Sequence, residues 1–326
     1  MSKIHDQLNI KLPIWSAGMG LGIAGSALSG AVSAADGLGV LGIGGMEAQA
    51  VRALIAEMRR HTARAFGVNI IMPMMQEGQI EACFDEKVPL LVLFWGDPSP
   101  YINDAHQRGI LVIAQCGDTD AAVRAADAGV DGVIVQGTEA GGHVMATRPL
   151  AEVVTATVKE LGSIPVIASG GIATGADIAN ALKLGASAVS MGTRFLATSE
   201  SLVLDSYKAK VVAAKSADTV LTELFDIGWP NAAHRVIRNR AYNDWDAAGQ
   251  PPSGERPDEN KVIGKLGSGD EAIDLPRYTV TPPLLHFDGD LEEAALYCGE
   301  SCERIDTIVS SEALMKQLLA ELKAAV

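Results

Sequence analysis

The chain has 326 residues, of which 48% are hydrophobic and 20% are charged, as in ordinary globular proteins. That length fits one large barrel with an appendage, and its core needs no disulfide or metal to be stable. The formal net charge of −14 argues against nucleic acid and anionic membranes as partners, because phosphates would be repelled over most of the surface.

The N-terminal region predicts a cytoplasmic protein. Charged residues are spread through the first 15 positions, where a secretory signal has an apolar core. The uncharged stretch Leu12–Ala35 contains five Gly, four Ser and a Pro, so we expect a strand, a loop and a helix there and no membrane span. Cys83, Cys116, Cys298 and Cys302 form no C-x-x-C pair. We therefore expect reduced thiols, with a metal site at the last two as the minor alternative.

A strand-then-helix pattern repeats through the first two thirds of the chain. Short apolar runs rich in β-branched residues alternate with Ala/Leu-rich stretches of helical period. The expected strands are Pro13–Ala17, Gly39–Gly45, Phe66–Met72, Pro89–Gly96, Ile110–Cys116, Gly132–Gly137, Pro165–Gly171 and Ala188–Phe195. Helices are expected between them, for instance Glu47–Arg60, Asp118–Ala128 and Thr174–Leu184. Strands that are apolar throughout fit a parallel sheet under helices, and eight β/α units in a row predict an α/β fold of the (β/α)8 TIM-barrel type.

An open Rossmann-like sheet is the main alternative architecture. Gly18, Gly20 and Gly22 follow the first strand, but they give G-x-G-x-G where the dinucleotide fingerprint needs G-x-G-x-x-G. The acidic residue expected at the end of the second strand is also missing, since that strand runs into Gly44 and Gly45. The closed barrel therefore fits better.

The composition changes after about residue 200. Residues 250–293 are rich in Pro, Gly and charged residues, and this composition does not fit another β/α repeat. We expect residues 206–302 to form an inserted, mainly helical cap that contacts substrate. The barrel then comprises residues 1–205 and 303–326, since apolar residues at helical spacing in Ile305–Val326 predict a closing helix.

In a barrel the ligand site lies at the carboxyl ends of the strands, so the residues that follow each strand are the candidates. Gly170 and Gly171 follow the seventh strand, and Gly192 and Thr193 lie at the corresponding height on the eighth. Glycines at this pair of loops let backbone N–H groups close on a phosphate, although turn glycines alone would look similar. The full set of expected cofactor-binding residues is Ala17, Gly18, Met19, Asn69, Gln115, Gln136, Gly141, Gly142, Ser169, Gly170, Gly171, Ser190, Met191, Gly192 and Thr193.

The remaining loop residues are mainly amides, Gly and Met, which suit a planar hydrogen-bonding ligand with a phosphate tail. FMN fits this description. His143 ends the loop after the sixth strand, and it is the one loop residue able to move protons near pH 7. We take it as the catalytic residue in preference to a structural role. His234, in the expected cap, is a weaker candidate.

These loops resemble the nitronate monooxygenase (2-nitropropane dioxygenase-like) family. Residues 136–143, with Glu139-Ala140-Gly141-Gly142-His143, are similar to its Q-G-x-E-A-G-G-H signature. Ile167–Ile172 and Met191–Phe195 resemble its FMN-phosphate segments, and Phe66–Asn69 resembles its flavin-contacting strand. The resemblance covers residues 10–200 in order and spacing.

The resemblance implies a TIM barrel with a helical cap, non-covalent FMN, and oxidation of alkyl nitronates by O2. It assigns Asn69, Gln136, Gly141, Gly171 and Ser190–Thr193 to FMN, and His143 to the catalytic base or substrate partner. Three features depart from the family pattern: the apolar Gly-rich loop 17–24, the cap, and the segment 297–301, where Glu300 stands in place of an expected Gln. They leave the flavin unaffected and the identity of the substrate open.

Two enzymatic functions compete. The first is nitronate oxidation by O2. The second is NAD(P)H-dependent reduction of a quinone or an enoyl thioester, because enoyl-ACP reductases of the FMN type share the E-A-G-G-H motif. A flavin-binding protein with a regulatory or storage role would leave His143 unused. We expect a small-molecule substrate and O2 as partners, and the sequence leaves a homodimer open.

Overall fold

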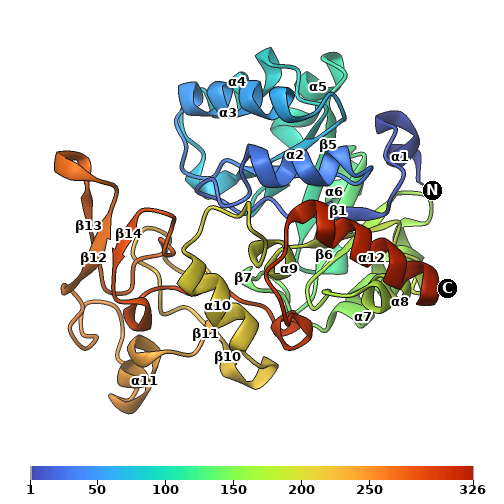
Figure 1. Cartoon of the computed structure of the whole chain (residues 1–326). Coiled ribbons are helices and arrows are strands. Elements are labelled where there is room, and N and C mark those ends of the chain that lie inside the picture. Colours follow the sequence, from blue (N-terminus) through green and yellow to red (C-terminus); the bar gives the residue numbers. More distant parts are fainter. Residues whose placement is uncertain (1, 326) are drawn as a thin grey trace.

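Eight parallel strands form the barrel, as the sequence predicts (Figure 1). The computed structural model describes residues 2–325. The strands are β1 (Ile14–Ser16), β2 (Val40–Gly42), β3 (Gly67–Ile71), β4 (Leu90–Phe94), β5 (Leu111–Cys116), β6 (Gly132–Gln136), β8 (Val166–Ser169) and β9 (Ala188–Met191). Their order is β1-β9-β8-β6-β5-β4-β3-β2. A parallel bridge between Trp15 and Leu38 brings the two edges of this sheet together.

The strands are apolar on both faces because they separate two cores. One set of side chains, including Trp15, Val40, Leu90, Ile113 and Ile134, fills the barrel interior. The side chains of alternate positions pack outward against the helices. Ile4, on the short helix α1 (Lys3–Leu8), belongs to the interior cluster, so α1 closes one end of the barrel.

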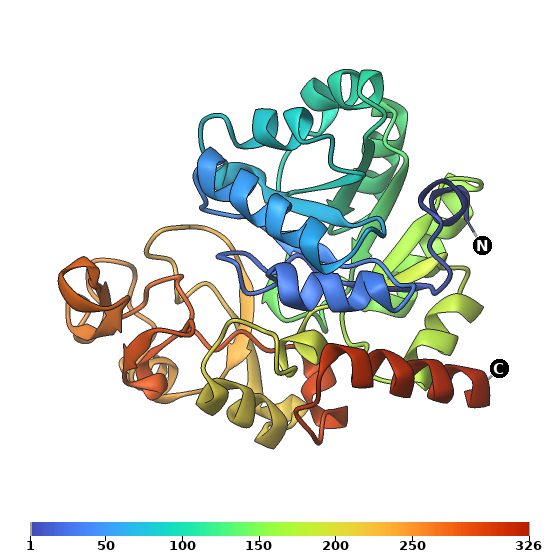
Figure 2. The same cartoon turned by 45° about the horizontal axis from the view of Figure 1, so that its top comes forward.

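Helices cover the outside of the barrel (Figure 2). They are α2 (Ser26–Ala34), α3 (Ala48–His61), α4 (Gln79–Asp85), α5 (Ser99–Gln107), α6 (Thr119–Ala128), α7 (Leu150–Leu161) and α8 (Gly175–Lys183). The expected closing helix is α12 (Ser311–Ala325), which packs against α8 and α2. The Glu321 carboxylate accepts a hydrogen bond from the Gly175 N–H at 2.7 Å, which ties α12 to the start of α8.

The eighth strand is shorter than expected. The prediction extended it to Phe195, but β9 ends at Met191, and Thr193–Leu196 form the short helix α9. The backbone turns at Gly192, which has helical torsion angles (φ −94°, ψ −73°). An apolar run cannot by itself distinguish a strand from a buried helical turn, and here it contained both.

The prediction of a mainly helical cap is wrong. Between residues 205 and 302 the chain has only two α-helices, α10 (Asp205–Ala213) and α11 (Arg240–Ala247). The strands β10 (Thr219–Thr222), β11 (His234–Ile237), β12 (Val262–Leu266), β13 (Ile273–Pro276) and β14 (Phe287–Gly289) build most of two antiparallel sheets. The first has the order β10-β11-β7, where β7 (Gly142–His143) comes from the barrel loop after β6, and the second has the order β13-β12-β14. Polar turns with a positive-φ Gly, such as Gly267 between β12 and β13, favour hairpins over helices.

Several 3-10 turns complete the chain: η1 (Met72–Met74), η2 (Ser216–Asp218), η3 (Gly269–Glu271), η4 (Leu291–Glu293) and η5 (Glu300–Arg304). Figure 1 shows β12, β13, β14 and α11 extending from one side of the barrel, away from α12. Within residues 2–325, no helix has the length and apolar character needed to cross a membrane.

Candidate functional site

A cavity of about 1240 Å³, counting its open mouth, lies at the carboxyl ends of the barrel strands. The structure brings every residue that the sequence placed in the site into its lining: Ala17, Gly18, Met19, Asn69, Gln115, Gln136, Gly141, Gly142, His143, Ser169, Gly170, Gly171, Ser190, Met191, Gly192 and Thr193. The region after residue 205 supplies Trp229, Val280, Pro282, Tyr297 and Ser301, which the sequence did not assign individually.

Glycines shape the backbone of the loops after β8 and β9, beside the cavity. Gly170 and Gly171 have φ values of +113° and +67°, which L side chains rarely adopt. A side chain at Gly192 would meet only the Cβ of Ala17, at 3.8 Å, so this backbone is open to the cavity. Asp177 caps the adjoining helix α8 by accepting from the N–H groups of Ala173 and Thr174. This arrangement is a typical cradle for a terminal phosphate.

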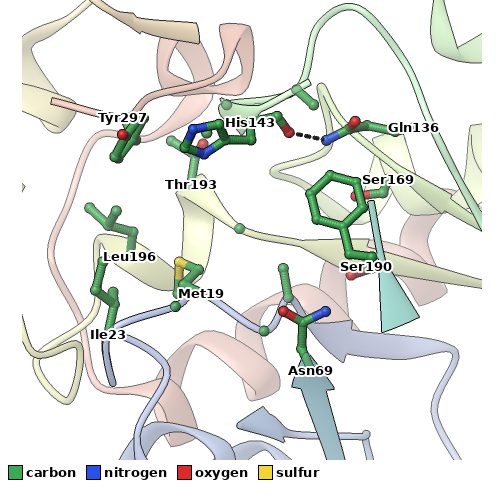
Figure 3. A pocket seen from close by; sticks show the side chains of 18 of the residues that line it. Met19, Ile23, Asn69, Gln136, His143, Ser169, Ser190, Thr193, Leu196 and Tyr297 are labelled. Carbon is green, nitrogen blue, oxygen red and sulfur yellow. Dashed lines mark hydrogen bonds between the residues drawn. The ribbon is translucent and has the colours of Figure 1, made fainter. Parts of the chain in front are cut away.

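Small polar side chains from three of the barrel strands also line the cavity. Asn69 is 3% exposed and donates from Nδ2 to the carbonyl of Val92 at 3.2 Å. Ser169 and Ser190 are also buried, and their hydroxyl groups come from adjacent strands. Figure 3 shows Asn69, Ser169 and Ser190 on the same side of the cavity. Uncharged hydrogen-bonding groups of this kind fit the edge of a planar heteroaromatic ring.

The segment 297–301 packs against the loops that follow β6 and β9. A Cβ on Gly141 would lie 2.2 Å from the Gly299 nitrogen, so these two backbones touch. The Gly299 N–H donates to the hydroxyl of Thr193 at 3.0 Å. From outside, Arg304 donates to the carbonyl of Gly171 and to the carboxylate of Asp177. The sequence marked this segment as unusual but gave no signal for Arg304, because that contact joins residues 133 positions apart.

His143 is held between the barrel and the region after residue 205. It lies on the two-residue strand β7 (Gly142–His143), which pairs with β11 so that His143 faces His234. Gln136, at the end of β6, donates to the His143 carbonyl at 3.0 Å and accepts from the Met145 N–H at 3.1 Å (Figure 3). Both ends of the Gln136 amide therefore hold the loop that carries His143. The sequence assigned Gln136 to the cofactor and missed this role.

The His143 ring is packed among aromatic rings. Trp229 stacks on it, with ring centroids 4.0 Å apart and planes at 20°, and Trp95 and Tyr297 lie at its edges. Burial, and secondarily the nearby His234, lower the pKa of His143 to about 3. Its Nε2 atom is buried with no hydrogen-bond partner among the described residues. A buried polar atom without a partner is unfavourable, and such atoms are typical of functional sites.

His234 and Arg194 have structural contacts that do not reach into the cavity. The Nδ1 of His234 contacts the Ala232 carbonyl at 2.8 Å, and its Nε2 accepts from the Phe225 N–H at 3.2 Å. Both nitrogens are therefore used by backbone groups, and burial lowers the pKa of this imidazole to about 4. The Arg194 guanidinium donates to the carbonyls of Ala197 and Thr307.

The arrangement fits a phosphorylated planar cofactor such as FMN. The glycine loops after β8 and β9 match one terminal phosphate, and the buried amide and hydroxyl groups match a ring with several hydrogen-bonding atoms. Among the described residues, no group of three or more His, Cys, Asp or Glu side chains lies close enough to hold a metal ion.

Comparison with known proteins agrees with this geometry. The family model described as "Nitronate monooxygenase" matches residues 1–89 and 75–321. The nitronate monooxygenase of Pseudomonas aeruginosa is 32% identical over 297 residues, covering 77% of this chain and 83% of that protein. A second relative, the (3aS,4S,5R,7aS)-5-hydroxy-7a-methyl-1-oxo-octahydro-1H-indene-4-carboxyl-CoA dehydrogenase of Mycobacterium tuberculosis, is 37% identical over 238 residues. The match covers 72% of this chain and 65% of that relative's length.

Solved structures share the whole architecture. FabK from Thermotoga maritima has a TM-score of 0.82 and 32% sequence identity, covering 99% of this chain and 96% of that chain. The nitroalkane oxidase of Streptomyces ansochromogenes has a TM-score of 0.80 and 26% identity, covering 99% of both chains. The similarity therefore extends beyond the barrel into the region after residue 205.

Proposed function

This chain belongs to the nitronate monooxygenase family of oxidoreductase enzymes, and from that membership we propose that it binds FMN non-covalently and oxidises alkyl nitronates with O2. The observation that carries the proposal is the single cavity in which the phosphate cradle, the polar ring-binding groups and His143 meet. Residues 1–205 and 303–326 would hold the flavin, and residues 206–302 would supply substrate contacts.

Each part of the site has a role in this proposal. The backbone of Gly171, Gly192 and Thr193 would hold the phosphate, and Asn69, Ser169 and Ser190 would orient the ring. Bound FMN would supply the electron acceptor that oxidises the substrate and the route by which the electrons reach O2.

His143 would act as the hydrogen-bonding partner of the substrate nitro group. Its pKa of about 3 keeps the imidazole neutral near pH 7. An efficient general base has a pKa near the working pH, so a neutral hydrogen-bonding role fits this environment better than that of a strong base. The Trp229 ring over His143 would exclude water from this contact.

Two measurements test the proposal. Purified protein is expected to be yellow and to release FMN, and no FAD, when denatured, because the cradle has the form of a site for one terminal phosphate. It is expected to consume O2 when an alkyl nitronate is added without a pyridine nucleotide. A colourless protein that takes up no FMN on reconstitution would overturn the cofactor assignment, and O2 consumption only with NAD(P)H would overturn the reaction.

The second candidate is an NAD(P)H-dependent flavin reductase that acts on quinones or enoyl thioesters. The observation in its favour is the whole-chain similarity to FabK, together with a relative named for a carboxyl-CoA substrate. Anaerobic mixing distinguishes the two functions. Bleaching of the flavin by NADH or NADPH supports the reductase, whereas bleaching by a nitronate alone supports the monooxygenase.

A further inference from the structure

One part of the cavity is lined by apolar side chains from separate segments. We call this set the apolar wall: Met19, Leu21, Ile23, Leu196, Trp229, Val280 and Pro282. Figure 3 shows Met19, Ile23 and Leu196 grouped on the side of the cavity opposite Asn69 and Ser190. Asn69 and Ser190, which fit a flavin ring, thus lie apart from these three side chains, which leaves the wall, including Met19 that the sequence analysis gave to the cofactor, for substrate.

The cavity lining carries no fixed charge. Among the described residues that line it, none is Lys, Arg, Asp or Glu. Charged side chains beside the lining residues are bonded elsewhere: Glu139 accepts from the Leu150 N–H, Arg235 donates to the Thr138 carbonyl and pairs with Glu300, and Arg304 donates to the Gly171 carbonyl and pairs with Asp177. Away from the glycine cradle, whose backbone N–H groups can hold a phosphate, a small anion in the cavity would therefore lose its water and gain no cation, which is strongly unfavourable.

The ionisable groups that do line the cavity are neutral. Burial lowers the pKa of His143 and raises that of Tyr297, so neither carries charge near pH 7. The Tyr297 hydroxyl already donates to the Val280 carbonyl at 2.7 Å. His143 has one buried nitrogen without a partner among the described residues. The site thus offers a polar substrate group a hydrogen bond and no ion pair.

Trp229 joins the apolar wall to His143. Its ring lies flat on the imidazole at 4.0 Å, and Trp95 supports it edge-on at 5.1 Å. Trp229 follows Gly228, whose φ of +105° sets the direction of this loop. A carbon chain along the wall would therefore contact the Trp229 ring next to the imidazole.

We infer that this site selects a predominantly apolar substrate, which is either uncharged or has an apolar chain much larger than its polar head. Trp229 determines this specificity. The inference deepens the proposed function: an alkyl nitronate is an anion and finds no cation here, so its binding comes from the hydrocarbon tail, and short nitronates are poor substrates. The inference rests on the proposed function in one respect only: its test uses the spectrum of bound FMN to detect ligand binding.

Unreactive ligand pairs test the inference without turnover. Butanamide, hexanamide and octanamide are compared with butanoate, hexanoate and octanoate at pH 7.5, by perturbation of the flavin spectrum and of tryptophan fluorescence in FMN-loaded protein. Each amide is expected to bind at least tenfold more tightly than its carboxylate. Each added methylene is expected to tighten binding about three- to fourfold, as burial of one CH2 predicts. Carboxylates that bind as tightly as amides, or an affinity independent of chain length, would overturn the inference.

Two variants of Trp229 test its part. Trp229→Ala is expected to remove most of the chain-length dependence, whereas Trp229→Phe, which keeps a ring over His143, retains it. Circular dichroism and FMN content confirm that both variants are folded. If Trp229→Ala binds the whole amide series as the unmodified protein does, Trp229 has no role in specificity.

Met74 allows the charge argument to be tested separately. It lines the cavity, and Lys has a similar length, so Met74→Lys places a cation there without a large change of volume. Hexanoate is expected to bind on the order of tenfold more tightly to Met74→Lys than to the matched control Met74→Leu. Equal affinities in the two variants would refute the charge argument. Because all these ligands are unreactive, an inactive enzyme with nitronates would refute the proposed function and leave these binding results intact.

Discussion

Replacing Gln136 with Leu separates the positioning of His143 from the binding of cofactor. Leu keeps the approximate volume but removes the bonds to the His143 carbonyl and the Met145 N–H. Gln136 is 3% exposed, so water cannot readily replace its amide. Each of these two backbone groups left without a partner costs about 1–3 kcal/mol, so the free energy of unfolding should fall by about 2–6 kcal/mol.

The fold should survive this substitution because other bonds hold the loop. β7 still pairs with β11, and the Val144 N–H still donates to the Ala233 carbonyl at 2.8 Å. A catalytic group displaced by about 1 Å loses on the order of 10²-fold in rate, so kcat/KM should fall by about 10- to 100-fold while FMN content stays near one per chain.

The assay combines three measurements: urea unfolding, FMN content after denaturation, and O2 consumption per bound flavin. Gln115→Leu is the matched control, since it removes another amide from the same cavity. It should weaken FMN retention and leave turnover per bound flavin unchanged. If Gln136→Leu instead loses FMN while turnover per flavin is preserved, Gln136 is a cofactor ligand, as the sequence alone implied, and the positioning argument is wrong.

Three further predictions concern Gly171, His143 and pH. Gly171→Val should abolish FMN retention without unfolding the barrel, because a β-branched residue is strained at φ +67° and its Cβ would lie 3.0 Å from the Cβ of Glu139, so the backbone of the cradle must shift; full FMN content in this variant would disprove the cradle. His143→Ala should keep FMN and lose about 10²–10³-fold in turnover with a preformed nitronate, because the hydrogen bond to the nitro group is lost; rates of both half-reactions that stay unchanged in rapid mixing would make His143 structural. The lowered pKa values of His143 and His234 mean that unfolding takes up protons below pH 6.5. Stability should therefore fall from about pH 6.5 towards pH 3–4, by about 2 kcal/mol per imidazole between pH 7 and 5. Urea unfolding of His143→Ala should show a shallower loss over this range, and an identical slope would contradict the pKa assignment.

The sequence predicts the barrel well because its signals are local. Each strand is a short apolar run, and the loops after the strands must meet at one end once the barrel closes. That geometric rule alone places residues as distant as Ala17 and Thr193 in one cavity, where the structure has them. The end of β9 was misjudged because Gly192 turns the chain within a continuous apolar run.

The region after residue 205 was predicted poorly because its structure depends on contacts that are distant in sequence. Its strands are short, and buried ion pairs such as Arg277 with Glu293 help to hold them in place of a continuous apolar core. The stacking of Trp229 on His143 is likewise invisible in the sequence, since neither residue belongs to a motif that names the other.

His143 shows why these two regions cannot be understood separately. The motif that identifies it belongs to the barrel, but its strand β7 is hydrogen-bonded to β11. The neighbouring loop is tied to β11 again by Arg235, whose guanidinium reaches the Thr138 carbonyl 97 residues away. The ring-binding groups are fixed by the barrel alone, whereas the position, burial and pKa of His143 depend on the later region. Changes after residue 205 would therefore alter the proposed chemistry at His143 while leaving the proposed ring-binding groups of the barrel in place.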